Sequence, residues 1–150
     1  MKVLVLNGPN LDILHRRDPA IYGRVSLADI ERSLAELGLT LGVTVECVQS
    51  NHEGALIDRL NRVDDDVAGV ILNPGGYTHT SVALMDSVEA ATVPVIEVHL
   101  SNIEAREEFR RVSLVGRAAS GRIMGLGVQG YHLALRALVH DVEKRGQVSG

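Results

Sequence analysis

Five short runs of valine, isoleucine and leucine are spaced along the chain. They cover residues 3–6, 43–48, 69–72, 93–98 and 121–124. Most of these runs are continuously apolar and do not alternate with polar residues, as is typical of strands buried on both faces of a parallel sheet. The pattern therefore predicts five buried parallel strands.

Apolar residues at helical spacing fill the segments between these runs. The predicted helices cover residues 27–37, 53–63, 81–91, 104–112 and 131 to about 144. Ser26 is the expected N-cap of the first helix, and Gly38 is its expected stop. The tail, from about residue 143 to residue 150, is expected to fray.

Strands and helices alternate along the whole chain, which predicts an α/β fold. Right-handed crossovers then give an open, doubly wound parallel sheet with helices on both faces. We expect the flavodoxin-like strand order 2-1-3-4-5 in a single catalytic domain over residues 1–150, because no linker, repeat or low-complexity segment divides the chain. Ligands of such a sheet bind beyond the carboxyl ends of the strands, at the switch point between strands one and three.

Composition and charge narrow the possible function classes. The chain has 150 residues and a net charge of −4, with no run of like charges, so we expect neither a nucleic-acid nor a membrane partner. Its N-terminal apolar run is too short for a signal sequence or a membrane span. Cys47 is the single cysteine, which excludes an intrachain disulfide and fits a reducing, cytoplasmic compartment. Tryptophan is absent and aromatic residues make up only 3% of the chain, so a stacking surface for flat cofactors is poorly supplied.

Glu97, His99 and Ser101 alternate along the fourth predicted strand and its end, so their side chains share one face. A carboxylate beside an imidazole favours the protonated imidazole and fixes its tautomer, which suits a histidine that donates a proton. The alternative is an edge strand with an ordinary polar face. Because a central strand of this fold is expected to be apolar on both faces, the pattern favours the functional interpretation.

Residues 101–104, Ser-Asn-Ile-Glu, have the spacing of a capping box and are expected to begin the helix over 104–112. A helix N-terminus with unpaired amides also binds anions. Arg106 and Arg110 would share one face of this helix, where an anion between them would offset their mutual repulsion. A solvated surface explains Arg110 equally well.

The segment 14–24 has the composition of a loop and carries three arginines around Tyr22. A mobile lid has this character, and close arginines in a water-excluded site would stabilise a phenolate. On composition alone, an ordinary surface loop is the simpler interpretation.

Two further patterns have open interpretations. His79 follows a glycine pair, where it would either donate to a substrate or cap the helix that begins near Ser81. Residues 125–130 form a G-x-G-x-x-G pattern, but only 20 residues follow, and no later strand supplies an acid to bind a ribose. We interpret these glycines as a tight turn, and a flavodoxin-like nucleotide- or flavin-binding module stays as the alternative function. No cluster in the sequence has convincing metal-ligand spacing.

Several motifs together resemble the type II 3-dehydroquinate dehydratases, in order and without large gaps from residue 1 to about residue 140. The motifs are Asn7-Gly8-Pro9-Asn10-Leu11, Ile21-Tyr22-Gly23, Gln49-Ser50-Asn51-His52-Glu53-Gly54, Asn73-Pro74-Gly75, Thr78-His79-Thr80-Ser81, Glu97-Val98-His99-Leu100-Ser101-Asn102 and Ala105-Arg106-Glu107-Glu108-Phe109-Arg110.

The resemblance implies a flavodoxin-like fold, no metal or organic cofactor, and trimers grouped into a homododecamer. It implies anti elimination of water from 3-dehydroquinate through an enolate, in the shikimate pathway or in quinate breakdown. It also implies a mechanism without a Schiff-base lysine, which agrees with a chain whose only lysines, Lys2 and Lys144, are poorly placed for chemistry. A non-catalytic homologue that serves as an assembly protein is a second alternative.

Residue roles follow from the same resemblance. Tyr22 would remove the proton alpha to the ketone, and Arg17 would stabilise its phenolate. Asn10 would hold a water against the enolate oxygen. His99, oriented by Glu97, would protonate the departing hydroxyl.

Other matched positions would bind the substrate or order the lid. They are Asn73, His79 and Arg110 for the hydroxyl groups, the backbone amides of Leu100 and Ser101 for the carboxylate, Asp86 from a neighbouring subunit, and Arg106 for the lid. The chain departs from the family's common pattern at Asp12, His15, Asp18 and Met85.

Overall fold

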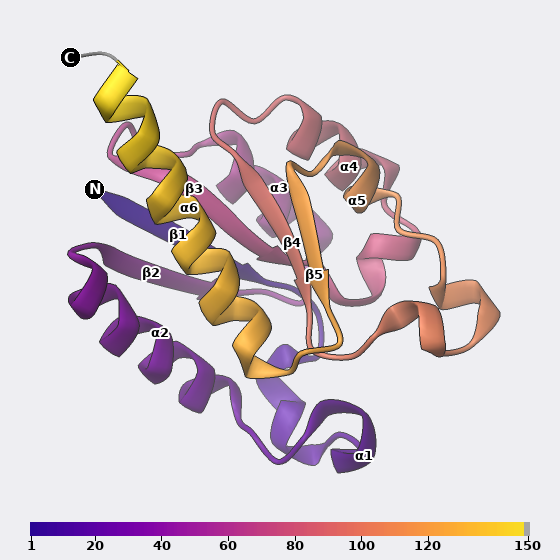
Figure 1. Cartoon of the computed structure of the whole chain (residues 1–150). Coiled ribbons are helices and arrows are strands. Elements are labelled where there is room, and N and C mark those ends of the chain that lie inside the picture. The colour runs from indigo at the N-terminus through magenta and orange to yellow at the C-terminus, as the bar shows by residue number, and fades with distance from the viewer. Residues whose placement is uncertain (149–150) are drawn as a thin grey trace.

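The structure, a computed structural model, describes residues 1–148 as an α/β fold built on one parallel sheet. The sheet has five strands in the order β2-β1-β3-β4-β5, and every neighbouring pair is parallel (Figure 1). The strands are β1 (Lys2–Asn7), β2 (Thr44–Gln49), β3 (Val67–Asn73), β4 (Val95–His99) and β5 (Gly121–Met124). The predicted fold class and strand order are therefore confirmed.

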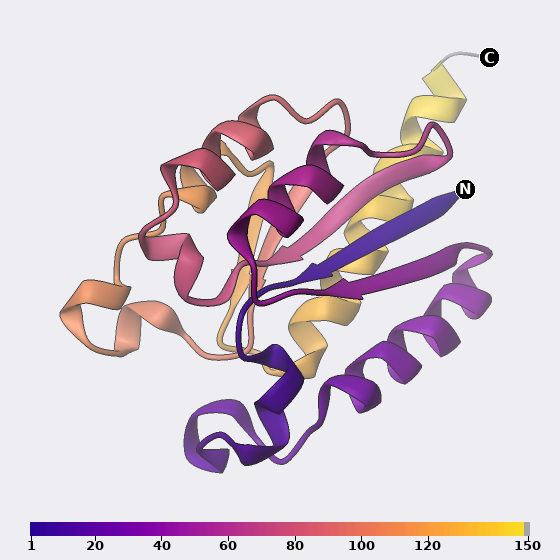
Figure 2. The ribbon, with the colours of Figure 1, turned by 180° about the vertical axis from the view of Figure 1, so that it is seen from behind.

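Helices cover both faces of the sheet and enclose two apolar cores. The helices α2 (Leu27–Leu41) and α6 (Val128–Val148) pack on one face. The other face is covered by α3 (Glu53–Asn61), α4 (Val82–Glu89) and α5 (Val115–Ala118), with α3 and α4 nearest the viewer in Figure 2. Because successive side chains of a strand point to opposite faces, a strand between two cores is apolar at every position. This explains the continuous apolar runs in the sequence.

The first long helix begins where the sequence predicts but ends later. Ser26 and Asp29 form a capping box, in which the Ser26 hydroxyl accepts from the Asp29 amide at 3.1 Å and the Asp29 carboxylate accepts from the Ser26 amide at 3.0 Å. The predicted stop at Gly38 is wrong, because α2 continues to Leu41 and closes on Gly42 in the left-handed region at φ 72°. Gly38 instead allows close packing, since a Cβ there would lie 2.8 Å from the Val43 carbonyl oxygen.

The predicted helix over residues 104–112 is not present. Two short 3₁₀ turns, η3 (Ile103–Ala105) and η4 (Glu108–Arg110), replace it, and Arg106 between them is extended. The first turn is capped by the Asn102 side chain, which accepts from the Glu104 amide at 3.2 Å, so the capping box at Ser101 is also wrong. The segment is charged, and its one aromatic side chain, Phe109, is 68% exposed. Without a buried apolar face, a helix of this length has little to stabilise it.

The C-terminal helix is longer than the sequence predicts. It runs from Val128 through Val148, so residues 143–148 are helical where we expected a frayed tail, and residues 149 and 150 lie outside the described part of the chain. The glycines before it make a tight turn, with Gly125 at φ 83° and Gly127 at φ 56°. Of the helices between residues 1 and 148, none is both long and apolar enough to cross a membrane.

Four segments of short helical turns lie past the carboxyl ends of the strands. They are η1 (Leu11–Arg16) and α1 (Pro19–Tyr22) after β1, η2 (Gly75–His79) after β3, and the η3–η4 segment after β4. In Figure 1 the α1 segment and the η3–η4 segment flank the same end of the sheet. These segments carry most of the residues that the sequence predicts for the site.

Candidate active site

One pocket lies at the carboxyl end of the sheet, at the switch point that the fold predicts. Most of the predicted site residues line it, and they come from three strand ends. They are Arg17, Tyr22, Asn73, His79, His99, Leu100, Ser101, Arg106 and Arg110. Asn10, Glu97 and Asp86 do not line the pocket.

Glu97 and His99 form a hydrogen-bonded pair at the end of β4. The His99 Nε2 atom donates to Glu97 Oε1 at 2.6 Å, and the two side chains are 6% and 0% exposed. Alternation along β4 puts both on one face of the strand, as predicted. The carboxylate fixes which ring nitrogen of His99 carries the shared proton and leaves the other side of the ring for the pocket.

Two hydroxyl groups also contact the Glu97 carboxylate. Thr78 and Ser113 both donate to Oε1, the latter at 2.8 Å. Burial raises the pKa of Glu97, but the hydrogen bond and charge of His99 and the two hydroxyl donors outweigh it and lower the pKa to about 2. Local sequence patterns predicted no role for Thr78 or Ser113. Thr78 belongs to one of the motifs that resemble the family, but nothing in the sequence around Ser113 indicated this contact.

Tyr22 lies among two guanidinium groups from distant parts of the chain. Arg17 donates to the phenol oxygen at 2.5 Å and stacks over the ring at 4.0 Å. Arg106 donates to the same oxygen at 2.8 Å, with its guanidinium 5.3 Å from the ring centre. Two guanidinium groups therefore donate to one phenol oxygen, in the geometry of charge-assisted hydrogen bonds. The segment 14–24 therefore carries Tyr22 into the pocket, and Arg106 reaches it from the segment after β4. The family resemblance assigned Arg106 to this segment, whereas local sequence patterns did not.

Local contacts hold Tyr22 in position. The Asp18 side chain accepts from the Ala20 amide at 2.9 Å and caps the single turn of α1. The turn closes at Gly23, whose φ of 75° is strained for any residue with a Cβ. Leu14, 1% exposed, anchors the preceding turn in the core. Asp18 is one of the departures from the family pattern, and it serves here as a helix cap.

The predicted binding residues differ in burial and in the partners that their side chains contact. Asn73 is 4% exposed, and its amide nitrogen donates to the Tyr131 hydroxyl at 2.9 Å. Tyr131 in turn donates to Asn7 Oδ1 at 2.6 Å, and burial raises its pKa so that it stays a neutral phenol. His79 contacts the Val112 carbonyl through Nδ1 at 2.8 Å, and burial lowers its pKa. Arg110 is paired with the exposed Glu107 at 2.9 Å.

Asn10 lies beside the pocket on an exposed turn. Its φ of 67° is left-handed, a conformation that asparagine tolerates better than most residues. Its amide donates to the Asn51 side chain at 2.9 Å, and Asn51 donates to Asp12 at 3.3 Å. Asp86, on α4, is exposed and away from the pocket of its own chain. A role for Asp86 in another subunit's site stays a prediction.

The fold and the pocket define a class of protein. A doubly wound α/β sheet places two groups in one pocket: a phenol flanked by two guanidinium groups, and an imidazole that contacts a buried carboxylate. Such a pair is typical of an enzyme that removes one proton and donates another. Within residues 1–148, no three histidine, cysteine, aspartate or glutamate side chains group as metal ligands.

The comparisons with known proteins identify the family. Residues 1–139 match the family described as dehydroquinase class II. A 3-dehydroquinate dehydratase of Variovorax paradoxus is 56% identical over 143 residues, which cover 92% of this chain and 98% of that protein. The crystal structures of type II dehydroquinases from Butyrivibrio crossotus and Propionibacterium acnes superpose with TM-scores of 0.89, at 41% and 43% identity, covering 92% and 93% of this chain and 97% and 96% of those chains. The chain therefore belongs to the class II dehydroquinase family.

Proposed function

We propose that this chain is a hydro-lyase that dehydrates 3-dehydroquinate to 3-dehydroshikimate through an enolate. The proposal is supported by the names of its relatives and, above all, by one observation. Tyr22, with two guanidinium groups on its oxygen, lines the same pocket as His99, which is backed by the ionised Glu97.

In the first step, the Tyr22 phenolate removes the proton on the carbon alpha to the ketone. The electron pair of the broken C–H bond moves into the enolate, and Tyr22 becomes a neutral phenol. Arg17 and Arg106 hold the phenolate ready at its oxygen. Asn10 holds a water against the enolate oxygen, where the negative charge develops.

In the second step, the enolate collapses and expels the hydroxyl group. His99 donates its proton to that oxygen, so that water and not hydroxide departs. Glu97 orients the imidazole and offsets its charge before the transfer. Tyr22 then releases the proton that it took and His99 takes up a proton, both through solvent, which restores the site. A base and an acid on opposite sides of the ring give anti elimination.

The remaining pocket residues hold the substrate. Asn73, His79 and Arg110 bind its hydroxyl groups, and the amides of Leu100 and Ser101 bind its carboxylate. Arg106 also orders the segment over Tyr22, because its guanidinium joins the η3–η4 segment to α1.

The proposal extends to assembly and metabolism. The chain acts in the shikimate pathway of aromatic amino-acid biosynthesis, in the cytoplasm. It assembles as trimers grouped into a homododecamer, in which Asp86 reaches the site of a neighbouring subunit.

The first experiment mixes purified protein with 3-dehydroquinate and follows the ultraviolet absorbance of the conjugated enone. We expect the absorbance to rise, and to rise equally after the protein has been treated with borohydride in the presence of substrate. Borohydride traps a lysine imine, so loss of activity in that arm alone would contradict the imine-free mechanism. No rise with a correctly assembled protein would refute the proposed function, and yellow protein that binds FMN would indicate a flavin-binding module instead.

A further inference from the structure

The carboxylate of Glu97 has a second cationic neighbour, on the side away from His99. Arg122 Nε lies 2.9 Å from Glu97 Oε2, while His99, Thr78 and Ser113 all contact Oε1. The Arg122 contact is a close ion pair and not an aligned hydrogen bond, and Oε2 receives no hydrogen bond from residues 1–148. The two oxygens of one carboxylate are therefore divided between two cations.

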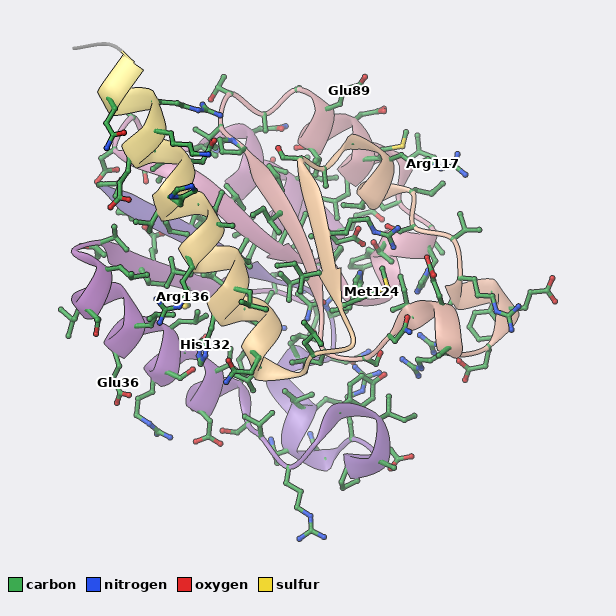
Figure 3. The ribbon with its side chains drawn as sticks, viewed as in Figure 1. Glu36, Glu89, Arg117, Met124, His132 and Arg136 are labelled. Atoms are coloured by element: carbon green, nitrogen blue, oxygen red, sulfur yellow. The ribbon has the colours of Figure 1, made fainter. Side chains whose placement is uncertain are left out.

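This contact follows from the register of the sheet. Glu97 on β4 lies directly opposite Arg122 on β5, and His99 opposite Met124, which is labelled in Figure 3. The Arg122 side chain is 28% exposed, so its guanidinium spans from solvent to a carboxylate that is 0% exposed. A cation from the edge strand thus enters the buried surroundings of His99.

Gly116 of α5 packs closely against the Glu97–Arg122 pair. A Cβ on Gly116 of α5 would lie 2.5 Å from Glu97 Oε2 and 2.6 Å from Arg122 Nε. The Gly116 amide donates to Ser113 Oγ at 2.8 Å, and Ser113 contacts the other carboxylate oxygen. A glycine at this position lets α5 close over the Glu97–Arg122 pair and fixes the donor to Oε1 at the same time.

We propose that Arg122 is a positioning residue that tunes the proton donor His99 through Glu97. This inference rests on the proposed function. A carboxylate shared with Arg122 stabilises protonated His99 less than an unshared carboxylate would, and the positive charge of Arg122 also repels the imidazolium. Both effects make His99 give up its proton more readily to the departing hydroxyl group.

Other charged groups near His99 face it from different elements. His79 is electrostatically coupled to Glu97, to His99 and to Arg110. Arg110, Arg17 and Arg106 line the pocket together with His99 and Tyr22. None of these forms an ion pair with Glu97 among the described residues, whereas Arg122 does. Changing Arg122 therefore alters the field at His99 without touching a group that lines the pocket.

The test compares pH profiles of kcat and KM for Arg122→Gln, Arg122→Val and Arg122→Lys. Valine suits a strand position and removes the charge without weakening the strand. The matched control is Arg117→Gln, which removes one charge from an exposed position on the neighbouring α5 (labelled in Figure 3). NMR titration of the His99 ring in the same variants is the second readout and needs no substrate.

In both neutral variants we expect the basic limb of the kcat profile to move up by about half to one pH unit. The kcat plateau should fall severalfold because a weaker acid transfers its proton more slowly, while KM changes little. Arg122→Lys should keep the limb near its original pH, and Arg117→Gln should leave the whole profile unchanged.

An unshifted basic limb in both neutral variants would overturn the proposal and leave Arg122 as a structural tie between β4 and β5. The midpoint of the basic limb does not depend on the fraction of folded enzyme, so it can also be measured in a destabilised variant. If the unmodified chain does not turn over 3-dehydroquinate, the proposed function has failed. The NMR midpoints of His99 then still decide whether Arg122 sets its proton affinity, with equal midpoints refuting it.

Discussion

His99 and Tyr22 line the same pocket, but different parts of the chain position them. His99 stands at the end of a central strand, 6% exposed, and its carboxylate partner is enclosed by Thr78, Ser113 and Arg122. Tyr22 stands on a single helical turn between β1 and α2, and its oxygen accepts hydrogen bonds from the long side chains of Arg17 and Arg106. One group belongs to the rigid sheet and the other to a segment above it.

The difference shows how a doubly wound fold can support acid–base chemistry. The sheet fixes the proposed acid before any substrate arrives, through a hydrogen-bond network that could not rearrange without disturbing the core. The proposed base, Tyr22, is hydrogen-bonded to Arg106, which is 84 residues away in the sequence. The position of Tyr22 therefore depends on how these two segments close over the pocket. Substitutions around the proposed acid and around the proposed base should therefore change activity in different ways.

The largest effect is expected from removing the two reacting groups. Tyr22→Phe and His99→Ala should each reduce kcat by about 10²–10⁴-fold with the fold preserved. Incubation of each variant with substrate in D₂O distinguishes the two roles, because NMR follows deuterium exchange at the alpha carbon of the substrate. The His99→Ala variant should still exchange the alpha proton of the substrate, because the base and the enolate remain. The Tyr22→Phe variant should lose both exchange and elimination. Near-normal turnover in either variant would refute the role given to that residue, and loss of exchange in His99→Ala would mean that the two proton transfers are not separable.

A smaller effect is expected from the two arginines on Tyr22. Arg17→Gln and Arg106→Gln should each lower kcat by roughly 10–100-fold, since each removes a charge-assisted hydrogen bond of about 1.5–3 kcal/mol. Arg17 should matter more, because it is the closer of the two to both the oxygen and the ring. Steady-state kinetics of each variant measure kcat and KM.

The exposed Arg16 next to Arg17 gives the matched control, and Arg16→Gln should leave kcat unchanged. The double variant tests whether the two guanidinium groups act on one oxygen. Their effects should then be non-additive, and strictly additive losses would argue that only one of them acts on Tyr22.

The last prediction concerns stability at low pH and the carboxylate partner of the proposed acid. The lowered pKa of Glu97, about 2 against an ordinary value of 4.5, stabilises the folded chain above pH 4.5, and this contribution is lost as pH falls through 2. Its size is of the order of 3 kcal/mol. Glu97→Gln should therefore be less stable than the unmodified chain at pH 7, and the difference should shrink as pH falls from 4.5 to 2.

The measurement is urea unfolding at several pH values and one protein concentration, with Glu89→Gln as the control on an exposed carboxylate of α4. The control should track the unmodified chain at every pH. A stability difference for Glu97→Gln that stays constant with pH would mean that the ionisation of Glu97 does not contribute.

Much of the site could be predicted from local patterns. Alternation along one strand was enough to bring Glu97 and His99 together, and the switch point of the strand order located the pocket. The segment 101–112 shows the limit, because its helix and capping box were inferred from spacing alone. The sequence has the right residues for a helix there, but the tertiary structure gives that helix no apolar surface to pack on.

The sequence by itself determined the elements whose cause is local: the buried strands, the N-cap of α2 at Ser26, the glycine turn before α6, and the order in which strands and helices alternate. Only the tertiary structure decided which distant side chains meet. Arg106 reaches Tyr22 across 84 residues, and Tyr131 reaches Asn7 across 124. Arg122 becomes a neighbour of Glu97 only through the β4–β5 register. The physical reason is that periodicity records which face of an element is buried, whereas a partner is chosen by how the faces of separate elements pack together in three dimensions.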